Sequence, residues 1–238
     1  MKMKGSLFLK SILVSFVLLL NLAAPAYGQA LQDSLRRAIN DLEYHPDSVE
    51  LRLRKAAINM ELQQWQIAKD EYDIVLRLSP ENLTALYFRA YANERLRRYQ
   101  FARLDYEHVL RIVPGHFEAE LGLALLNQKS KRYTEAYDLL SIMISQHPDS
   151  AIAYAARAEI EVEQQQYEPA EYDYTMALSK EPENQDWLLA RANLRIAMKR
   201  YSDALDDLDR MVALGTPRSA LSEYYRKVLK KTKKRRSR

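Results

Sequence analysis

Five prolines spaced 34 residues apart constrain the fold of this 238-residue chain more than any other feature of its sequence. They are Pro46, Pro80, Pro114, Pro148 and Pro182. Three further features keep the same period: an aromatic residue at 65, 99, 133, 167 and 201, an alanine three residues after each aromatic, and a second alanine twelve residues before the first. Several residue types that hold one register over five periods indicate a tandem repeat.

Each period contains two amphipathic stretches in which apolar residues stand three and four positions apart, as on one face of a helix. The alanine in each stretch is small enough to let two helices approach closely. The proline ends the second helix, because it cannot continue the hydrogen-bond pattern. Pro169 does not break the pattern, since it falls in the first turn of a helix, where its missing N–H has no partner to lose. The sequence therefore predicts an all-α fold of helix–turn–helix pairs.

Charged residues sixteen positions apart predict contacts within these pairs. The first repeat has Lys55 and Glu71 at this spacing, and the third has Leu123 and Leu139. An ion pair replaced by an apolar pair is what two touching positions would show. We therefore expect the two positions to meet across each helix pair; the alternative is independent surface charges, which contribute little to stability. The other three repeats place arginine and aspartate there: Arg89 and Asp105, Arg157 and Asp173, Arg191 and Asp207.

The period of 34, with small residues at positions 8 and 20, an aromatic at 17, Tyr or Leu at 24 and Pro at 32, resembles the tetratricopeptide repeat (TPR) family. The resemblance implies a right-handed α-solenoid of five tandem repeats within 47–216. Their expected bounds are 49–82, 83–116, 117–150, 151–184 and 185–216. Residues 29–46 are expected to form a partial N-terminal repeat helix, and 217–229 a C-terminal capping helix.

The chain departs from the family at position 11 of the repeat. The family usually has an aromatic residue there, and this chain has Asn59, Asn93, Asn127, Glu161 and Arg195. We expect the fold to stand and the packing on that side to be looser.

In the resembling family, the first helices of the repeats line an extended concave surface that binds segments of other proteins. Carried over by position, the resemblance implies that one set of residues faces a partner: Leu53, Ala57, Tyr87, Tyr91, Glu94, Arg95, Glu118, Leu121, Leu125, Gln128, Ile152, Glu159 and Asn193. The family's clamp for C-terminal carboxylates, a Lys at position 5 with an Asn at position 9, is absent here.

The centre of this set is its most apolar part. Tyr87, Tyr91, Leu121 and Leu125 form it, and aromatic anchors often carry much of the binding energy of an interface. The alternative is that these four residues merely pack between adjacent repeats.

Residues 1–28 have the order of a secretory signal peptide: three lysines, an apolar run from Ile12 to Leu22, and small residues at Ala26 and Gly28. The apolar run is shorter than the roughly 20 residues that a membrane-spanning helix needs. We expect export to the periplasm, cleavage before Gln29 and no transmembrane span afterwards. A secreted or envelope-associated protein, and an uncleaved N-terminal anchor, are the alternatives.

Charge is distributed unevenly along the chain. Between 29 and 225, 24 Lys and Arg stand against 32 Asp and Glu, whereas 226–238 holds nine basic residues and no acid. The segment 230–238 is predicted to be a disordered basic tail that contacts an anionic envelope component, or else a solubilising end. Its basic residues are Lys230, Lys231, Lys233, Lys234, Arg235, Arg236 and Arg238.

The sequence gives little indication of catalysis. The chain has no cysteine, its four histidines lack metal-ligand spacing, and it has no glycine-rich phosphate loop. We predict no enzyme activity, no cofactor, no metal site and no specific nucleic acid partner. The expected function is an exported scaffold that binds a peptide or helix of a partner protein. The alternative is an envelope-associated spacer that its basic tail holds to an anionic surface.

Overall fold

The structure is a computed structural model that describes residues 28–236, and throughout this range the chain is helical or in short turns, with no strand. Residues 1–27 of the predicted signal peptide lie outside the described residues. The chain divides into two compact units, Met1–Pro114 and Gly115–Arg238. None of the described helices is both long and apolar enough to cross a membrane.

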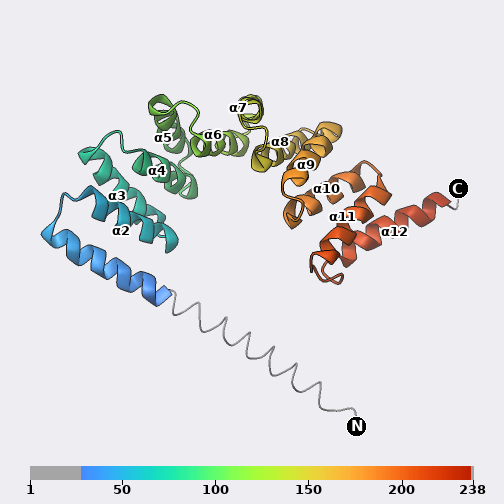
Figure 1. The fold of residues 1–238 in the computed structure, drawn as a ribbon, viewed down its shortest axis with the longest axis horizontal. Coiled ribbons are helices and arrows are strands. Elements are labelled where there is room, and N and C mark those ends of the chain that lie inside the picture. Colours follow the sequence, from blue (N-terminus) through green and yellow to red (C-terminus); the bar gives the residue numbers. More distant parts are fainter. Residues whose placement is uncertain (1–27, 237–238) are drawn as a thin grey trace, which may run out of the picture. The chain divides into compact units, whose positions relative to one another are not determined.

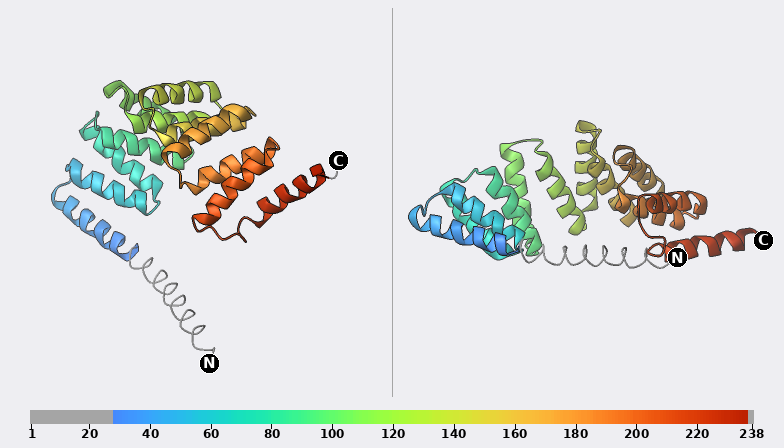
Figure 2. Two further views of the ribbon diagram at one scale, coloured as in Figure 1. Left: turned by 45° about the vertical axis from the view of Figure 1, so that its right-hand side comes forward. Right: turned by 60° about the horizontal axis from the view of Figure 1, so that its bottom comes forward.

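Unit 1 contains the first two predicted hairpins. A helix over residues 28–44 precedes them, and its buried residues are Ala38 and Leu42. The hairpins are α2 (Val49–Glu61) with α3 (Trp65–Leu78), and α4 (Leu83–Arg95) with α5 (Tyr99–Ile112). Within the unit, α3 packs against α4, so that one hairpin stacks on the next (Figures 1 and 2).

Unit 2 contains the other three hairpins. They are α6 (Phe117–Lys129) with α7 (Tyr133–Gln146), α8 (Ala151–Glu163) with α9 (Tyr167–Lys180), and α10 (Gln185–Ala197) with α11 (Tyr201–Ala213). Successive hairpins stack on each other, because α7 packs against α8 and α9 packs against α10. The predicted fold class, all-α with tandem helix–turn–helix repeats, is confirmed.

The last helix, α12 (Ser222–Arg236), differs from the expectation. It packs on α11 as a cap should, but it begins after a turn over 218–221 and runs on to Arg236. Residues 230–236, expected to be disordered, therefore continue the helix. Lysine and arginine are good helix formers, and cations are favourable near a helix C-terminus. No glycine or proline follows Pro217 to stop the helix.

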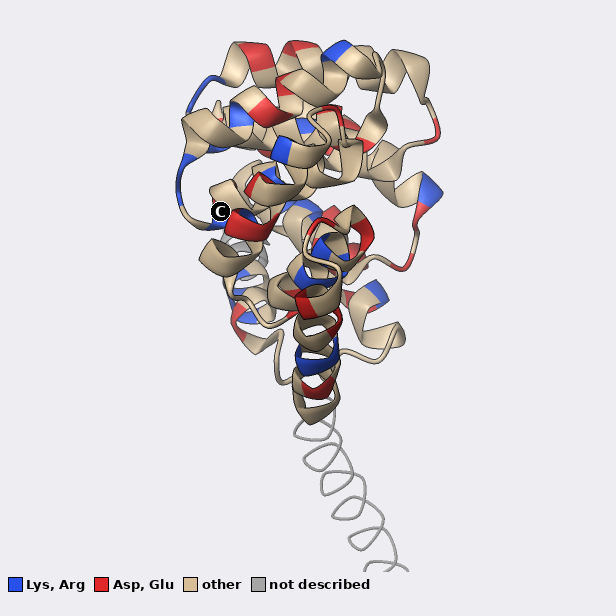
Figure 3. Ribbon diagram, turned by 90° about the vertical axis from the view of Figure 1, so that its left-hand side faces the viewer, with Lys and Arg blue, Asp and Glu red and all other residues tan. Residues whose placement is uncertain are grey.

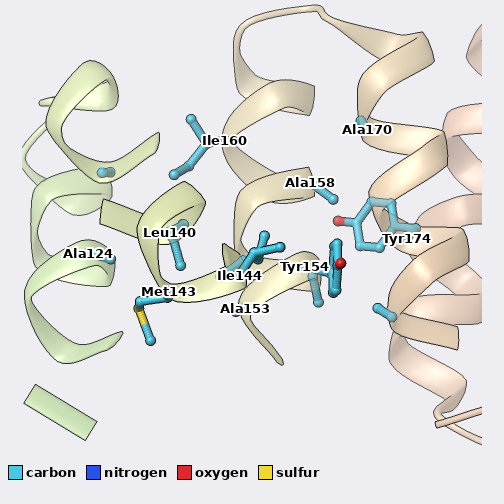
Figure 4. Packing of buried hydrophobic residues seen from close by; sticks show 14 of the residues in the cluster. Ala124, Leu140, Met143, Ile144, Ala153, Tyr154, Ala158, Ile160, Ala170 and Tyr174 are labelled. Carbon is cyan, nitrogen blue, oxygen red and sulfur yellow. The ribbon is translucent and has the colours of Figure 1, made fainter. Parts of the chain in front are cut away.

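The repeated alanines form the centre of every hairpin. All ten have no exposed surface: Ala56, Ala68, Ala90, Ala102, Ala124, Ala136, Ala158, Ala170, Ala192 and Ala204. Four positions after the alanine of each second helix, a large residue is buried beside the alanines. These residues are Tyr72, Tyr106, Leu140, Tyr174 and Leu208. Figure 4 shows this arrangement in unit 2, where the ring of Tyr174 lies near Ala158 on the neighbouring helix. The apolar core thus repeats with the sequence.

Each turn between hairpins uses the proline and the residues around it. The second helix ends two residues before the proline, and the residue just before the proline takes an extended conformation, as proline requires of its neighbour. Two residues after the proline, a side chain caps the next helix by accepting a hydrogen bond from a backbone N–H. These caps are Ser48, Asn82, His116, Ser150 and Asn184.

Each turn within a hairpin contains a residue in the left-handed conformation. These residues are Gln63, Arg97, Lys131, Gln165 and Lys199, with φ between 57° and 63°. The following residue donates its backbone N–H five residues back, for example from Arg200 to the carbonyl of Arg195 at 2.8 Å. This is the Schellman ending of a helix, which usually has glycine at the left-handed position.

The predicted contacts across the hairpin are confirmed in the four repeats that have charged residues at these positions. The guanidinium of Arg89 donates to both carboxylate oxygens of Asp105, at 2.9 and 2.6 Å, and Lys55 Nζ lies 2.7 Å from Glu71 Oε1. Arg89 also donates to Asp73 of the preceding hairpin, at 2.9 Å. The same double contact recurs for Arg157, with Asp173 and Ser141, and for Arg191, with Asp207 and Thr175. Figure 3 shows basic and acidic residues interspersed along the helices.

The expectation of looser packing at position 11 is wrong. Asn59, Asn93, Asn127 and Glu161 are each at most 3% exposed, and Asn59 donates to the backbone carbonyl of Lys55 at 2.9 Å. At the fifth repeat, Arg195 instead pairs with Glu171 and Asp207. At position 11 of the first four repeats, the polar side chains are therefore buried within the hairpin.

We expect Lys199→Gly to raise the free energy of unfolding by about 0.5–1 kcal/mol, because glycine adopts positive φ without the steric strain that a Cβ introduces. Lys199→Ala is the matched control: it removes the same side chain and keeps the strain, so no gain is expected. Urea denaturation of both variants checks this prediction, and equal stabilities would contradict it.

We expect stability to depend on the protonation of Glu161. Burial, and then the charge of Asp173, raise the pKa of this carboxyl from 4.5 to about 7, although Arg157 opposes the shift. The folded state therefore binds the proton more tightly than the unfolded state, and stability falls as pH rises from about 4.5 to about 7. Glu161→Gln should remove this dependence and raise the free energy of unfolding at pH 8 by up to about 3 kcal/mol.

Denaturation at several pH values tests this prediction, with Glu168→Gln as the control on an exposed glutamate of α9. The same pH profile in the wild type and in Glu161→Gln would contradict it.

Candidate functional site

The predicted partner-facing residues all lie on the first helices of the hairpins, and none of the thirteen is fully buried. The exposed ones are Ala57, Tyr91, Arg95, Glu118, Ile152, Glu159 and Asn193; the partly buried ones are Leu53, Tyr87, Glu94, Leu121, Leu125 and Gln128. Those numbered up to 95 belong to unit 1 and the rest to unit 2. The structure therefore presents two separate sets, one in each unit.

Unit 1 carries an aromatic platform made of Trp65, Tyr91 and Arg95. The edge of one ring meets the face of the other, with the centroids of Trp65 and Tyr91 6.1 Å apart and the planes at 66°. The guanidinium carbon of Arg95 lies 4.9 Å from the Trp65 ring centroid, within the range of a cation–π contact. Tyr91 is nevertheless 40% exposed. Two side chains of α4 thus rest on a tryptophan at the start of α3 and still face solvent.

Tyr87 has a different role from Tyr91. Its ring packs edge-on against Phe88, with centroids 5.1 Å apart, and at a tilt against the buried Tyr106, at 5.8 Å. Both neighbours lie in the same hairpin, so these contacts are within one repeat and not between adjacent repeats. The hydroxyl of Tyr106 donates to Glu94 at 2.8 Å. Burial, followed by the nearby charge of Glu94, raises the pKa of Tyr106, which keeps this hydroxyl a donor. Tyr106 therefore contacts both residues: its ring packs against Tyr87 and its hydroxyl holds the carboxylate of Glu94.

Unit 2 carries an acidic patch made of Gln128, Glu159 and Glu163. The amide of Gln128 on α6 donates to Glu163 Oε1 on α8 at 2.9 Å and also hydrogen-bonds Glu159. Partial burial of the carboxyl raises the pKa of Glu159, the hydrogen bond from Gln128 lowers it, and the charge of Glu163 raises it further. Tyr133 donates its hydroxyl to Glu163.

Apolar residues of the same helices accompany the acidic patch. Ile152, on α8, is 46% exposed. Leu121 and Leu125, on α6, pack partly against the core of unit 2 and keep some exposed surface. The first-helix side of α6 and α8 thus combines apolar side chains with two carboxylates.

Sequence reasoning missed two members of these sites. The sequence marks Trp65 only as one of five repeated aromatic residues and does not distinguish Glu163 from other charged residues. Each of these residues makes a contact between successive hairpins. Trp65 contacts Tyr91 on α4, and Glu163 accepts a hydrogen bond from Gln128 on α6. Spacings of 26 residues from Trp65 to Tyr91 and 35 from Gln128 to Glu163 were the available signal.

Two of the four histidines make structural contacts through their side chains. His116 caps α6, and the His147 ring meets Phe117 edge-on at 5.4 Å. Within residues 28–236, no three His, Asp or Glu side chains are grouped so that they could hold a metal ion.

Comparison with known proteins agrees with the repeat. A family model described as tetratricopeptide repeat matches residues 53–117. No curated protein matches the chain. A tetratricopeptide repeat protein from Parabacteroides merdae is similar in structure, with 22% identity, a TM-score of 0.66, and coverage of 84% of this chain and 78% of that one.

Two further solved structures are similar. PilW, a type IV pilus biogenesis factor, has 18% identity and a TM-score of 0.70 over 81% of this chain and 90% of its own. YrrB, a TPR protein with an unusual peptide-binding site, has 15% identity and a TM-score of 0.58 over 82% and 97%. At these identities the likeness concerns the fold. The matched segment and the same hairpin, repeated through both units, show that the chain has the fold of tetratricopeptide repeat proteins.

Proposed function

We propose that this chain is an exported scaffold that holds a segment of a partner protein against the exposed faces of its first helices. The observation that carries the proposal is the aromatic platform of unit 1. A tyrosine that is 40% exposed, and yet fixed by a tryptophan beneath it, is the kind of rigid aromatic surface that dominates binding energy at protein interfaces. A surface without a binding role would not require Tyr91 to be fixed in one position by Trp65.

Preorganisation gives the platform its value for binding. Ordering a free side chain at an interface costs roughly 0.5–1.5 kcal/mol, and the contact with Trp65 has already restricted Tyr91 before a partner arrives. Arg95, on the same tryptophan, adds a positive charge beside the ring. Glu94 adds a carboxylate that Tyr106 holds in position. A segment with an apolar side chain and one polar group of either charge fits this surface.

Tyr91→Ala is expected to weaken partner capture about 30-fold, the loss of roughly 2 kcal/mol that follows removal of an aromatic anchor. A photo-crosslinking amino acid at position 91, in the cells that make the chain, followed by mass spectrometry, identifies the partner. The affinities of the wild type and of Tyr91→Ala for that partner are then compared by fluorescence anisotropy. A distinct protein should be crosslinked there.

Tyr172 provides the control, because it is 61% exposed and lies on α9, a second helix. The crosslinker at 172 should capture no specific protein, and Tyr172→Ala should leave capture unchanged. Equal labelling from both positions, or none from either, would sink the proposal. Circular dichroism and thermal denaturation establish that each variant is folded.

A second candidate function, an envelope-associated spacer, is favoured by the geometry around α12. A shallow cavity of about 750 Å³ lies along this helix, with Tyr225 and Leu229 among its lining residues and Arg218, Arg226 and Lys230 beside them. The Arg218 guanidinium carbon stacks 4.2 Å from the Tyr225 ring centroid. Apolar side chains among cations suit an anionic surface, and the basic residues up to Arg236 continue the same helix.

If α12 anchors the chain, removal of 230–238 should abolish its cosedimentation with vesicles that contain phosphatidylglycerol. Binding of the intact chain should be weak to phosphatidylcholine vesicles and should fall at about 0.5 M salt, where charge interactions are screened beyond a few ångströms. Unchanged sedimentation of the truncated chain would dismiss this function while leaving the scaffold proposal intact.

A further inference from the structure

Some carboxylates of the described structure pair with an arginine across a hairpin, as Asp105 does with Arg89 and Asp173 with Arg157. Others, such as the buried Glu120 and Glu161, have a side-chain oxygen without a hydrogen-bond partner. Glu159 and Glu163 differ: among residues 28–236, their hydrogen-bond partners are the uncharged Gln128 and Tyr133. One turn apart on α8, these two carboxylates repel each other.

This repulsion acts at the surface, because both residues are exposed, although neighbouring side chains desolvate the carboxyl of Glu159 in part. Partial burial raises the pKa of Glu159, and Glu163 raises it further. Like charges four residues apart destabilise a helix by a few tenths of a kcal/mol, and a cation placed between them would reverse the sign of the interaction. The patch is therefore complementary to a positive charge that the hairpins do not supply.

The surface beside the patch is apolar. Ile152 is 46% exposed, two helical turns before Glu159, and Leu121 and Leu125 on the neighbouring helix α6 keep some exposed surface. An apolar helix face that ends in two carboxylates matches a segment with apolar residues followed by a basic one, because each part of the segment then meets its complement.

We infer that unit 2 binds a basic segment of a partner protein, with a lysine or arginine between Glu159 and Glu163 and apolar side chains on Ile152, Leu121 and Leu125. This inference rests on the proposed scaffold function and specifies the chemistry of the partner. Gln128 is a positioning residue, since its amide holds the carboxylates on the side of α8 that faces α6. Its neutral donor keeps them in place and leaves their charge available.

The experiment is selection of random 12-residue peptides, displayed on phage, on the full chain. The wild type should enrich peptides with Lys or Arg next to Leu, Ile or Phe. For one such synthetic peptide, Glu159→Gln with Glu163→Gln should weaken binding at least about tenfold by fluorescence anisotropy, the effect of losing one partly buried charge contact. Ile152→Ser should weaken binding of the same peptide while a preference for basic residues persists.

The matched control is Glu168→Gln with Glu183→Gln, which removes the same charge from exposed positions of unit 2 away from the patch. Binding should be unchanged. Thermal denaturation of both double variants shows whether they are folded, so a loss of binding by an unfolded chain is not mistaken for support.

Two results would overturn the inference. The first is a set of selected peptides that lack basic residues, or that bind the patch double variant as tightly as the wild type. If crosslinking at position 91 still captures a partner in that case, the scaffold function stands and this inference fails alone.

The second is a dimer of the chain that is abolished by the patch double variant or by removal of 230–238. That result would assign the patch to the basic tail of a second copy. No capture at 91 and no selected peptide would remove both proposals together.

Discussion

The close approach of two helices at paired alanines is the constraint on which the rest of the structure depends. All ten of these alanines are without exposed surface, so no larger side chain fits where the helices of a hairpin cross. The approach places position 7 of one helix opposite position 23 of the other. At that separation Arg89 reaches both oxygens of Asp105, at 2.9 and 2.6 Å. The geometry of the ion pairs is therefore a consequence of the small residues beside them.

The ion pairs in turn connect one hairpin to the next. Each of the three arginines uses its remaining nitrogen on the preceding hairpin, where it meets a carboxylate at Asp73 and hydroxyls at Ser141 and Thr175. Desolvation offsets much of the Coulombic gain of a buried pair, so the apolar core supplies most of the stability. The pairs satisfy the carboxylates that the packing has buried, and their loss would leave a charge without a partner inside the hairpin.

The periodic part of the structure could be predicted from the sequence because every repeat makes the same contacts. The hairpins, their ends near the prolines and the pairing over sixteen residues all belong to this class. The contact from arginine to the preceding hairpin escaped prediction, because its acceptor changes from Asp73 to Ser141 to Thr175 and conceals the spacing. The polar residues of position 11 were expected to loosen the packing, yet Asn59 finds its hydrogen-bond partner one helical turn back.

The candidate sites could be located by position but not by chemistry. The thirteen residues predicted to face a partner were chosen by their place in the repeat, and all keep exposed surface. The contacts that distinguish them are not repeated from one described hairpin to the next. Trp65 underlies Tyr91 in a single repeat, and Gln128 gathers Glu159 and Glu163 in a single pair of hairpins. A repeated frame constrains the residues that every unit needs and leaves the first-helix faces free to vary. Unit 1 uses that freedom for an aromatic surface and unit 2 for an acidic one, so one kind of hairpin presents two chemically different surfaces.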